Sequence, residues 1–420
     1  MSYCGLDFGT SNSTIGVMRG NRLQLAPLEG GEPTLPSAIF FDFEEQARPR
    51  FGRAAMAAYA GGAEGRLMRS LKSVLGTGLI DEETMLQTRR IGFREVIGLV
   101  VRHLKALAEE AAGQPLDAVV HGRPVRFVDG DEAADRRAQD ALEAIARDCG
   151  FRHVSFQYEP IAAALAYEAE VVREEVALIA DIGGGTSDFS IVRLSPERAR
   201  RTERADDILA NDGARIGGTD FDRLLSLEAV MPHLGYRSGL KEKGLLTPNH
   251  WYVDLATWSK INFLYAPGVL AEVRRLIPKA AHPDLLRRLA EVLEHHLGHW
   301  LAMQVERAKI DLSGERSVDI DLSRIEPGLE APATWRGLGE AVAEPVERLG
   351  GLVRECLAQA RLRPDQVDAV FLTGGSTLLP AVRGAILAEV PGARVVEGDK
   401  FGAVGLGLAI EASRRFGAAA

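Results

Sequence analysis

Cysteine is scarce in this sequence, and its spacing excludes the common cysteine-based sites. The chain contains only Cys4, Cys149 and Cys356, which are far apart in the sequence. They form no Cys-x-x-Cys pair, so the sequence supports neither a zinc ribbon nor a metal cluster. Scattered, unpaired cysteines are typical of a reducing compartment, and we therefore expect a cytoplasmic protein.

Long apolar runs and an excess of positive charge are also lacking. No window approaches the roughly 18–20 apolar residues of a membrane span. The first residues lack the basic start and apolar core of a signal peptide, so we expect no membrane partner. The net charge of −9 argues against binding a polyanion, so we expect no nucleic-acid partner. Apolar residues make up 46% and charged residues 26%, which excludes a disordered or fibrous chain.

Two segments of the chain share one pattern of strand, turn and returning strand. Residues 3–11 predict a strand that enters a Gly/Ser/Thr turn, and residues 13–18 predict a strand that returns. Residues 176–188 and 189–194 repeat this pattern. Asp7 and Asp181 occupy matching places 174 positions apart, too far for a solenoid repeat. The spacing predicts a duplicated domain with two similar lobes.

Helical patterns alternate with these strands, which predicts an α/β fold with mixed sheets. We expect helices over residues 139–149, 161–170, 285–311, 338–360 and 380–389, the third of them interrupted near Gly298. Short buried strands are expected at 117–120 and 367–372. The charged segment 198–212 is expected to be a surface hairpin.

Both turns are suited to holding phosphate. Backbone N–H groups bind phosphate well where glycine lets the backbone approach and Ser or Thr hydroxyls add donors. A single turn of this kind is explained equally well as an ordinary tight turn and as a phosphate site. Two copies in matching contexts favour a phosphate site. Asp7 and Asp181, beside the turns, are suited to a hydrated Mg²⁺.

Two further elements could contact a nucleoside. Gly374-Gly375-Ser376-Thr377 follows a predicted strand, where a ribose could approach closely. Glu306, Lys309 and Ser313 share one helix face and offer an acceptor, a cation and a hydroxyl. On spacing alone, an exposed ion-paired face explains the second element better.

In this order, the four elements resemble the seventy-kilodalton heat-shock chaperone family (the DnaK type), within the actin and sugar-kinase ATPase superfamily. The similarity is greatest to the short, YegD-like branch. The resemblance rests on Asp7-x-Gly9-Thr10, Glu159-Pro160-x-Ala162-Ala163-Ala164, Asp181-Ile182-Gly183-Gly184-Gly185-Thr186-x-Asp188, Gly217-Gly218-Thr219-Asp220-Phe221-Asp222, Glu306-Arg307-Ala308-Lys309-x-x-Leu312-Ser313 and Gly374-Gly375-Ser376-Thr377.

The resemblance implies a two-lobed, actin-like ATPase fold of duplicated ribonuclease-H-like domains around a nucleotide cleft. Lobe I would span residues 1–170 and lobe II residues 171–409, with an outer subdomain over about 218–312 and a tail at 410–420. This leaves no room for the family's peptide-binding domain. The implied function is ATP hydrolysis with Mg²⁺, and with K⁺ as a further candidate ion. Protein clients or co-chaperones are expected partners, unidentified, and the chain is expected to be a monomer.

The resemblance also assigns roles to individual residues. Asp7 and Asp181 would hold Mg²⁺ through water, and the catalytic set would be Lys72, Glu159, Thr186 and Asp188. Eight of the 50 basic residues are lysines, and two of them, Lys72 and Lys309, fall on motif positions. The nucleotide-binding residues would be Gly9, Thr10, Ser11, Asn12, Gly183, Gly184, Gly185, Thr186, Gly217, Gly218, Glu306, Lys309, Ile310, Ser313, Gly374, Gly375, Ser376, Leu378 and Asp399.

Three regions depart from the family's pattern. Ile310 and Leu378 stand where the family usually has two arginines that sandwich adenine, which predicts an apolar clamp on the base. His121-Gly122-Arg123-Pro124 replaces a strand that ends in Val-Pro, with the proline offset by one residue. Residues 231–300 match poorly. There we expect the aromatic residues to pack in a core and the histidines to lie on a solvated helix face: Trp251, Tyr252, Trp258, Phe263, Tyr265, His295, His296 and His299.

Two other functions remain compatible with the same loops. A small-molecule kinase of the superfamily would move phosphate onto a sugar, although such kinases lack the helix pattern of Glu306 to Ser313. An actin-like scaffold would use the nucleotide only as a switch. A dehydratase activator would need a cysteine-bound cluster between two subunits, which three scattered cysteines do not support.

Overall fold

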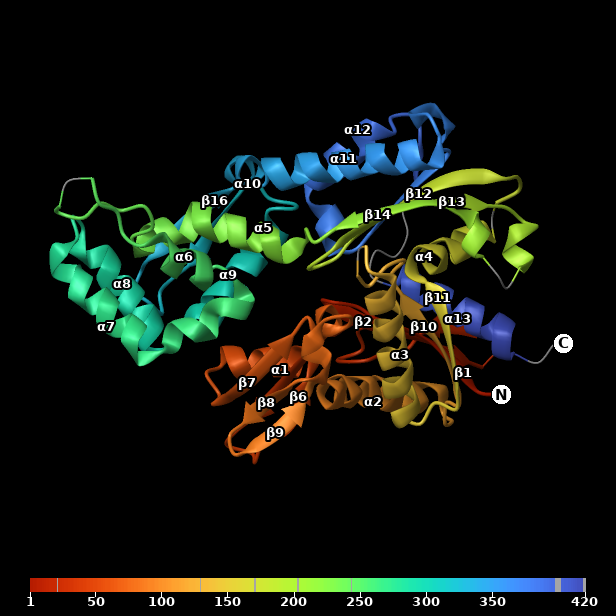
Figure 1. Cartoon of the computed structure of the whole chain (residues 1–420), viewed down its shortest axis with the longest axis horizontal. Helices are drawn as coiled ribbons and strands as arrows, with labels where there is room; N and C mark the ends of the chain where they lie inside the picture. The colour runs from red at the N-terminus through yellow and green to blue at the C-terminus, as the bar shows by residue number, and fades with distance from the viewer. Residues whose placement is uncertain are drawn as a thin grey trace. The chain divides into compact units, whose positions relative to one another are not determined.

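The computed structural model describes residues 1–20, 22–128, 130–169, 171–201, 204–242, 244–396 and 402–417 (Figure 1). The chain forms two compact units. Unit 1 comprises residues 1–215, 350–377 and 386–420, and unit 2 comprises residues 216–349 and 378–385. Within the described residues, no helix combines the length and apolar character that crossing a bilayer requires.

The first sheet of unit 1 contains the predicted N-terminal hairpin. Its strand order is β11-β10-β1-β2-β3, with β4 paired to β2. Strands β1 and β2 are antiparallel, with Asp7 opposite Thr14, whereas β10 and β11 run parallel to β1. The strands are β1 (Tyr3–Phe8), β2 (Asn12–Arg19), β3 (Arg22–Leu25), β4 (Leu35–Pro36), β10 (Ala118–Arg123) and β11 (His153–Tyr158).

The second sheet of unit 1 repeats this topology. Its order is β14-β13-β12-β17-β18, with β12 antiparallel to β13 and parallel to β17. The strands are β12 (Glu175–Ile182), β13 (Ser187–Leu194), β14 (Ile208–Ala214), β17 (Ala369–Thr373) and β18 (Arg394–Val396). The duplication predicted from the matching aspartates is therefore present in the strand pairing.

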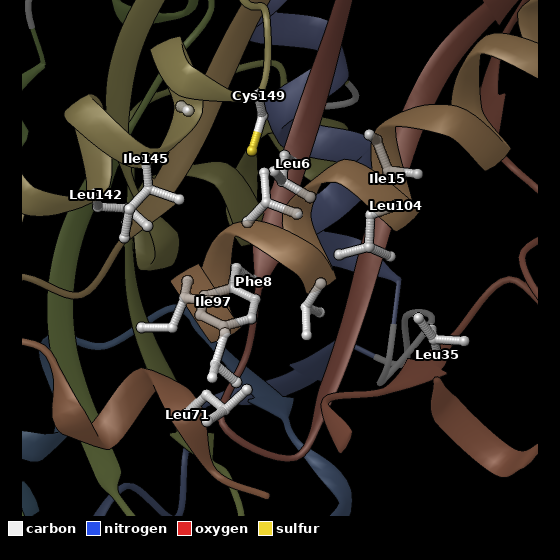
Figure 2. Close-up of a cluster of buried hydrophobic side chains, with 14 of the residues drawn as sticks. Leu6, Phe8, Ile15, Leu35, Leu71, Ile97, Leu104, Leu142, Ile145 and Cys149 are labelled. Atoms are coloured by element: carbon white, nitrogen blue, oxygen red, sulfur yellow. The ribbon is translucent and has the colours of Figure 1, made fainter. Parts of the chain in front are cut away.

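Helices cover the first sheet on both faces. On one face, α2 (Phe93–Ala112) and α3 (Glu132–Asp148) enclose the core shown in Figure 2, which includes Leu6 and Ile97. Apolar residues of α2 recur at helical spacing, so a single face of this helix is buried. Fully burying each Leu or Ile contributes about 1.5–3 kcal/mol. The other face carries α4 (Glu159–Glu168) and α13 (Ala403–Phe416).

Helix α13 approaches the first sheet and α4 unusually closely. A Cβ atom at Gly407 would lie 1.8 Å from the backbone oxygen of Ala162 in α4. Real Cβ contacts are never this short, so only glycine fits at this crossing. The tail expected from residue 410 therefore begins inside a packed helix, which ends at Phe416.

Smaller elements of unit 1 carry Lys72. Three strands form one small sheet and two form another, and a short 3₁₀ helix at Leu71–Val74 lies between the two sheets in the sequence. The elements are β5 (Ala38–Asp42), β6 (Arg48–Phe51), β7 (Gly65–Arg69), β8 (Glu83–Leu86), β9 (Arg89–Gly92) and α1 (Gly52–Ala60).

Unit 2 is mostly helical, and most of its aromatic residues pack as expected. Trp251 and Tyr252 are buried, but Phe263 is 74% exposed, contrary to the prediction of a core position. The elements are α5 (Gly218–Leu225), α6 (Asn249–Leu255), α7 (Pro267–Leu276), α8 (Pro283–Glu294), α9 (Gly298–Asp311), α10 (Trp335–Ala341), β15 (Ser317–Asp321) and β16 (Glu330–Thr334).

Two helices each contribute residues to both units, α11 (Ala343–Ala360) and α12 (Pro380–Glu389). The interruption expected near Gly298 separates α8 from α9. The helix expected over 338–360 is instead two helices, α10 and α11, which break at Val342.

The histidines of the α8–α9 region do not share a solvated face. His295 is exposed beside Glu291, and His296 stacks on Tyr265. His299 is buried and lies edge-on to Trp258, with ring centroids 4.8 Å apart. The prediction of a solvated face is therefore wrong for His299, because α9 turns this residue toward an aromatic neighbour.

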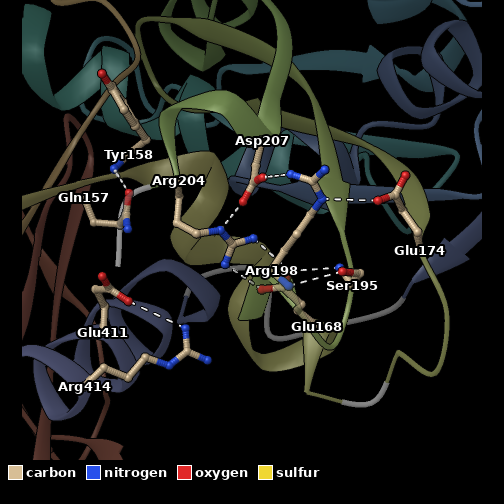
Figure 3. Close-up of polar contacts among 10 residues, drawn as sticks. All are labelled: Gln157, Tyr158, Glu168, Glu174, Ser195, Arg198, Arg204, Asp207, Glu411 and Arg414. Atoms are coloured by element: carbon tan, nitrogen blue, oxygen red, sulfur yellow. Dashed lines mark hydrogen bonds and ion pairs between the residues drawn. The ribbon is translucent and has the colours of Figure 1, made fainter. Parts of the chain in front are cut away.

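The charged segment 198–212 is not an exposed hairpin. Part of it forms the edge strand β14, and Arg204 and Asp207 are buried (Figure 3). Arg204 donates two hydrogen bonds to Glu168, both 2.8 Å long, and a further one to Asp207. The prediction failed because two buried carboxylates compensate the charge of the Arg204 guanidinium. Asp207 is close to it in the sequence, whereas Glu168 is 36 positions away.

Candidate functional site

The two predicted phosphate turns of unit 1 lie against each other. A Cβ atom at Gly184 would stand 1.8 Å from Oγ of Ser11, and one at Gly185 would stand 3.5 Å from Cγ2 of Thr10. Glycine at 184 therefore allows the two turns to approach this closely. The structure thus brings the two Gly/Ser/Thr segments together, although they are far apart in the sequence.

Hydrogen bonds fix the shape of the two turns. Ser37 donates its hydroxyl proton to the carbonyl of Gly9 at 2.7 Å and lies 2.9 Å from the hydroxyl of Ser13. In the second turn, the N–H of Gly183 donates to the carbonyl of Thr186 at 2.9 Å. The turns are therefore held in place by residues next to the expected phosphate ligands, including Ser37, which the sequence analysis did not identify.

Four carboxylates converge beside these turns. Asp7 and Asp181 are the penultimate residues of β1 and β12, Asp188 is the second residue of β13, and Glu159 is the first residue of α4. Burial and the charges of Glu159 and Asp181 raise the pKa of Asp7 to about 8, against a smaller opposing effect of Lys72. Burial, Asp181 and Glu159 likewise raise the pKa of Asp188 to about 7.

The pKa of Asp181 is raised in the same way, by burial and by Glu159, although a hydrogen bond from Thr373 opposes the rise. Burial is the largest cause of all three increases, and the neighbouring carboxylates add to it, so these side chains are unfavourable as buried anions without a further cation. The arrangement is therefore suited to receive a cation.

Lys72 is the cation within this group. Its Nζ atom lies 2.6 Å from Oε1 of Glu159, and the two side chains are 11% and 12% exposed. Burial lowers the pKa of Lys72, but the charges of Glu159, Asp7 and Asp181 outweigh this effect and raise it. Lys72 is therefore charged at neutral pH and paired with Glu159.

Asp7 and Asp181 fit a hydrated divalent cation better than a dehydrated one. Among the residues that the structure describes, no three His, Cys, Asp or Glu side chains lie close enough to ligate one ion. Mg²⁺ usually keeps several waters and uses one or two carboxylates. Two carboxylates whose proton affinity is raised by burial and by the charge of Glu159 meet that requirement.

The third Gly-rich element joins the same group through its first residues. Strand β17 pairs with β12, which places Thr373 opposite Asp181. The hydroxyl of Ser376 donates to the carbonyl of Gly183 at 3.1 Å. Gly374 and Gly375 therefore lie next to the second predicted phosphate turn. Thr373 is a further residue of the candidate site, and the sequence analysis did not identify it.

The remaining predicted residues belong to unit 2 or lie outside the described residues. Lys309 of α9 is buried, pairs with Asp222 at 2.8 Å and donates to the carbonyl of Gly218 at 3.2 Å. Lys309 thus joins α9 to the start of α5 and does not stand on an open face with Glu306 and Ser313. Gly217 precedes α5 as its N-cap.

Ile310 and Leu378 both belong to unit 2, and both expose their apolar side chains, to 58% and 37%. Asp399 lies outside the residues that the structure describes.

A comparison with protein families matches the chain to the model described as Hsp70 protein, over residues 3–233 and 294–417. The unmatched stretch lies within residues 231–300, where the sequence analysis expected a poor match. The matched residues include both phosphate turns, Lys72, Glu159 and the third Gly-rich element. Members of the family are nucleotide-binding ATPases with an actin-like fold. Because the match covers most of the chain, and the loops lie in the expected order, this protein belongs to the Hsp70 family.

Proposed function

We propose that this protein binds ATP with Mg²⁺ and hydrolyses it in unit 1. The observation that carries the proposal is the convergence of four carboxylates and one lysine beside two facing Gly/Ser/Thr turns. Phosphoryl transfer depends on positioning and charge neutralisation more than on covalent chemistry by the protein. The group described above supplies both requirements.

The turns and the carboxylates bind different parts of the nucleotide–Mg²⁺ complex. The turns at 9–12 and 183–186 hold the β- and γ-phosphates through backbone N–H groups and through the hydroxyls of Thr10, Ser11 and Thr186. Asp7 and Asp181 hold the hydrated Mg²⁺. When bound, Mg²⁺ neutralises the negative charge that develops on the transferred phosphoryl group.

The attacking water is oriented by Glu159 and Asp188. A proton acceptor works best when its pKa lies near the working pH, and the pKa of Asp188 is about 7. Glu159 is paired with Lys72 at 2.6 Å, so its carboxylate is partly neutralised. A γ-phosphate competes for the same ammonium group, and its arrival frees Glu159 to accept a hydrogen bond from water.

Single-turnover ATP hydrolysis with Mg²⁺ tests this assignment. We expect Asp181→Ala and Lys72→Ala to lower the rate by roughly 100-fold or more, as removal of one preorganised charge does in other enzymes. The matched controls Asp365→Ala and Lys260→Ala remove exposed charges and should leave the rate unchanged. Equal rates in all five proteins would refute the mechanism, and turnover only after a sugar is added would indicate a kinase.

A further inference from the structure

One buried histidine at the edge of the site has no role in the proposed mechanism. His121 lies in β10, beside Leu6 of β1, which directly precedes Asp7. Its side chain is fully buried and packs near Phe156, with ring centroids 5.8 Å apart. A histidine within a buried strand is a polar group whose hydrogen bonds must be accounted for.

The hydrogen bonds of the ring determine its tautomer. Nδ1 lies 2.8 Å from the carbonyl oxygen of Gly122, which can only accept, so Nδ1 carries a proton. Burial lowers the pKa of His121 to about 4, and the charge of Lys72 adds to this effect. The ring is therefore neutral at neutral pH, and Nε2 is an acceptor.

Nε2 has no donor in this state. Among the described residues, no hydrogen bond reaches this atom, although it is buried. An unpaired buried acceptor is unfavourable, so a state of the protein that provides a donor is favoured by comparison. We therefore expect a hydrogen-bond donor to reach Nε2 in another state of the site.

Lys72 is suited to be that donor. It is the cation whose charge acts on the imidazole, and its ammonium group has three protons. One of these is directed to Glu159 at 2.6 Å. The adjacent Gly122 also borders Glu159, because a Cβ atom there would lie 3.2 Å from Cγ of that residue. The peptide 121–122 therefore adjoins Glu159, whose carboxylate pairs with Lys72.

We propose that Nε2 of His121 is a second acceptor for the ammonium group of Lys72. When a phosphate draws Lys72 away from Glu159, His121 holds the lysine on the phosphate, and Glu159 is left to act on water. This inference rests on the proposed ATPase function and makes His121 a positioning residue. No proton is transferred, because the lysine stays charged and the imidazole stays neutral.

The nitrogen resonances of the imidazole provide a direct test that does not depend on hydrolysis. In protein with ¹⁵N-labelled histidine, Mg²⁺ plus AMPPNP should move the Nε2 resonance of His121 toward the hydrogen-bonded position. The Lys72→Met variant, shown to bind AMPPNP by calorimetry, should not show this shift. An unchanged Nε2 resonance in the wild type, or the same shift in Lys72→Met as from a bound water, would overturn the proposal.

Two substitutions separate positioning from simple packing. His121→Leu keeps a similar volume without an acceptor and should lower single-turnover hydrolysis at saturating ATP by about 10–100-fold, as a small misplacement of a reacting group does. His121→Gln retains an acceptor and should remain within about threefold of the wild type. His153→Leu, on the exposed side of β11, is the matched control.

The outcomes distinguish the two proposals. Equal losses in the Leu and Gln variants, with equal losses of thermal stability, would assign His121 a packing role only and overturn the inference while the ATPase function stands. A wild-type protein that neither binds AMPPNP nor hydrolyses ATP would refute the proposed function, and the inference with it.

Discussion

The two ends of helix α4 lie in two buried groups of charge that differ in composition. The Glu159 group, at the first residue, contains Asp7, Lys72, Glu159, Asp181 and Asp188. The Glu168 group, at the last residue, contains Glu168, Arg198, Arg204 and Asp207 (Figure 3). The first has four carboxylates and one cation, whereas the second has two of each.

The difference in charge balance separates the proposed binding site from a structural element. In the Glu168 group every carboxylate has a guanidinium partner, and Glu168 also accepts a hydrogen bond from the N–H of Ser195 at 3.1 Å. The charges of the Glu168 group are therefore compensated within the group, without an additional ion. In the Glu159 group, burial and then the charges of neighbouring carboxylates raise the pKa values of Asp188 and Asp7 to about 7 and 8, so the site favours additional positive charge.

The largest expected effect is on stability, from breaking the balanced group. Arg204→Met leaves Glu168 and Asp207 buried without their main partner, and the Arg204 and Glu168 side chains are 1% and 0% exposed. We expect a loss of about 3–5 kcal/mol in the free energy of unfolding, measured by urea denaturation.

The double variant Arg204→Met, Glu168→Met should recover part of that loss, because it removes the unpaired carboxylate and leaves Asp207 with Arg198. A loss below about 1 kcal/mol in the single variant would mean that the Glu168 group does not depend on its charge balance.

The next effect is a pH dependence that originates in the unbalanced group. Folding keeps Asp7 and Asp188 protonated up to a pKa of about 8 and 7, whereas the unfolded carboxyls have pKa values near 3.8. Their contribution to stability is full below pH 4 and disappears as the pH rises through 7 to 8. In EDTA, the free energy of unfolding should therefore fall between pH 4 and 8, after other groups are accounted for.

Mg²⁺ should reduce this decrease, because a bound cation favours the ionised carboxylates. Asp7→Asn should reduce it as well, since asparagine does not titrate. The same slope in Asp7→Asn as in the wild type would show that the decrease has another origin.

The smallest effect is expected from an exposed ion pair. Arg336 and Glu340 of α10 are 87% and 70% exposed at 3.0 Å. Because solvent screens the pair, Arg336→Met should change the free energy of unfolding by less than about 0.5 kcal/mol. A loss similar to that of Arg204→Met would contradict the view that burial makes the balanced group important.

Local sequence patterns were sufficient to predict the strands and turns of the site. The Gly/Ser/Thr turns after Asp7 and Asp181 follow from short apolar strands and turn residues, and both hairpins are confirmed by the pairing. The duplication followed from comparing the two segments. These predictions succeeded because each depends on residues that are neighbours in the sequence.

Contacts between distant residues were not predictable in this way. The partner of Lys72 is Glu159, that of Arg204 is Glu168, and that of Lys309 is Asp222. The segment around each of these three cations has a sequence that is equally consistent with an exposed, polar segment. The burial of each cation depends on a carboxylate delivered by another element, and a single sequence does not reveal which element that is.

The close contact of α13 has a consequence for the order of synthesis. Helix α13 ends at Phe416, yet it packs on β1 and β2, which end by residue 19. At about 5–20 residues per second, the ribosome needs roughly 20–80 s to proceed from one to the other. During that time the face of the first sheet that carries Gly5 lacks its helix. Strands β1 and β2 are therefore covered on this face only once α13 has been made, long after their own synthesis.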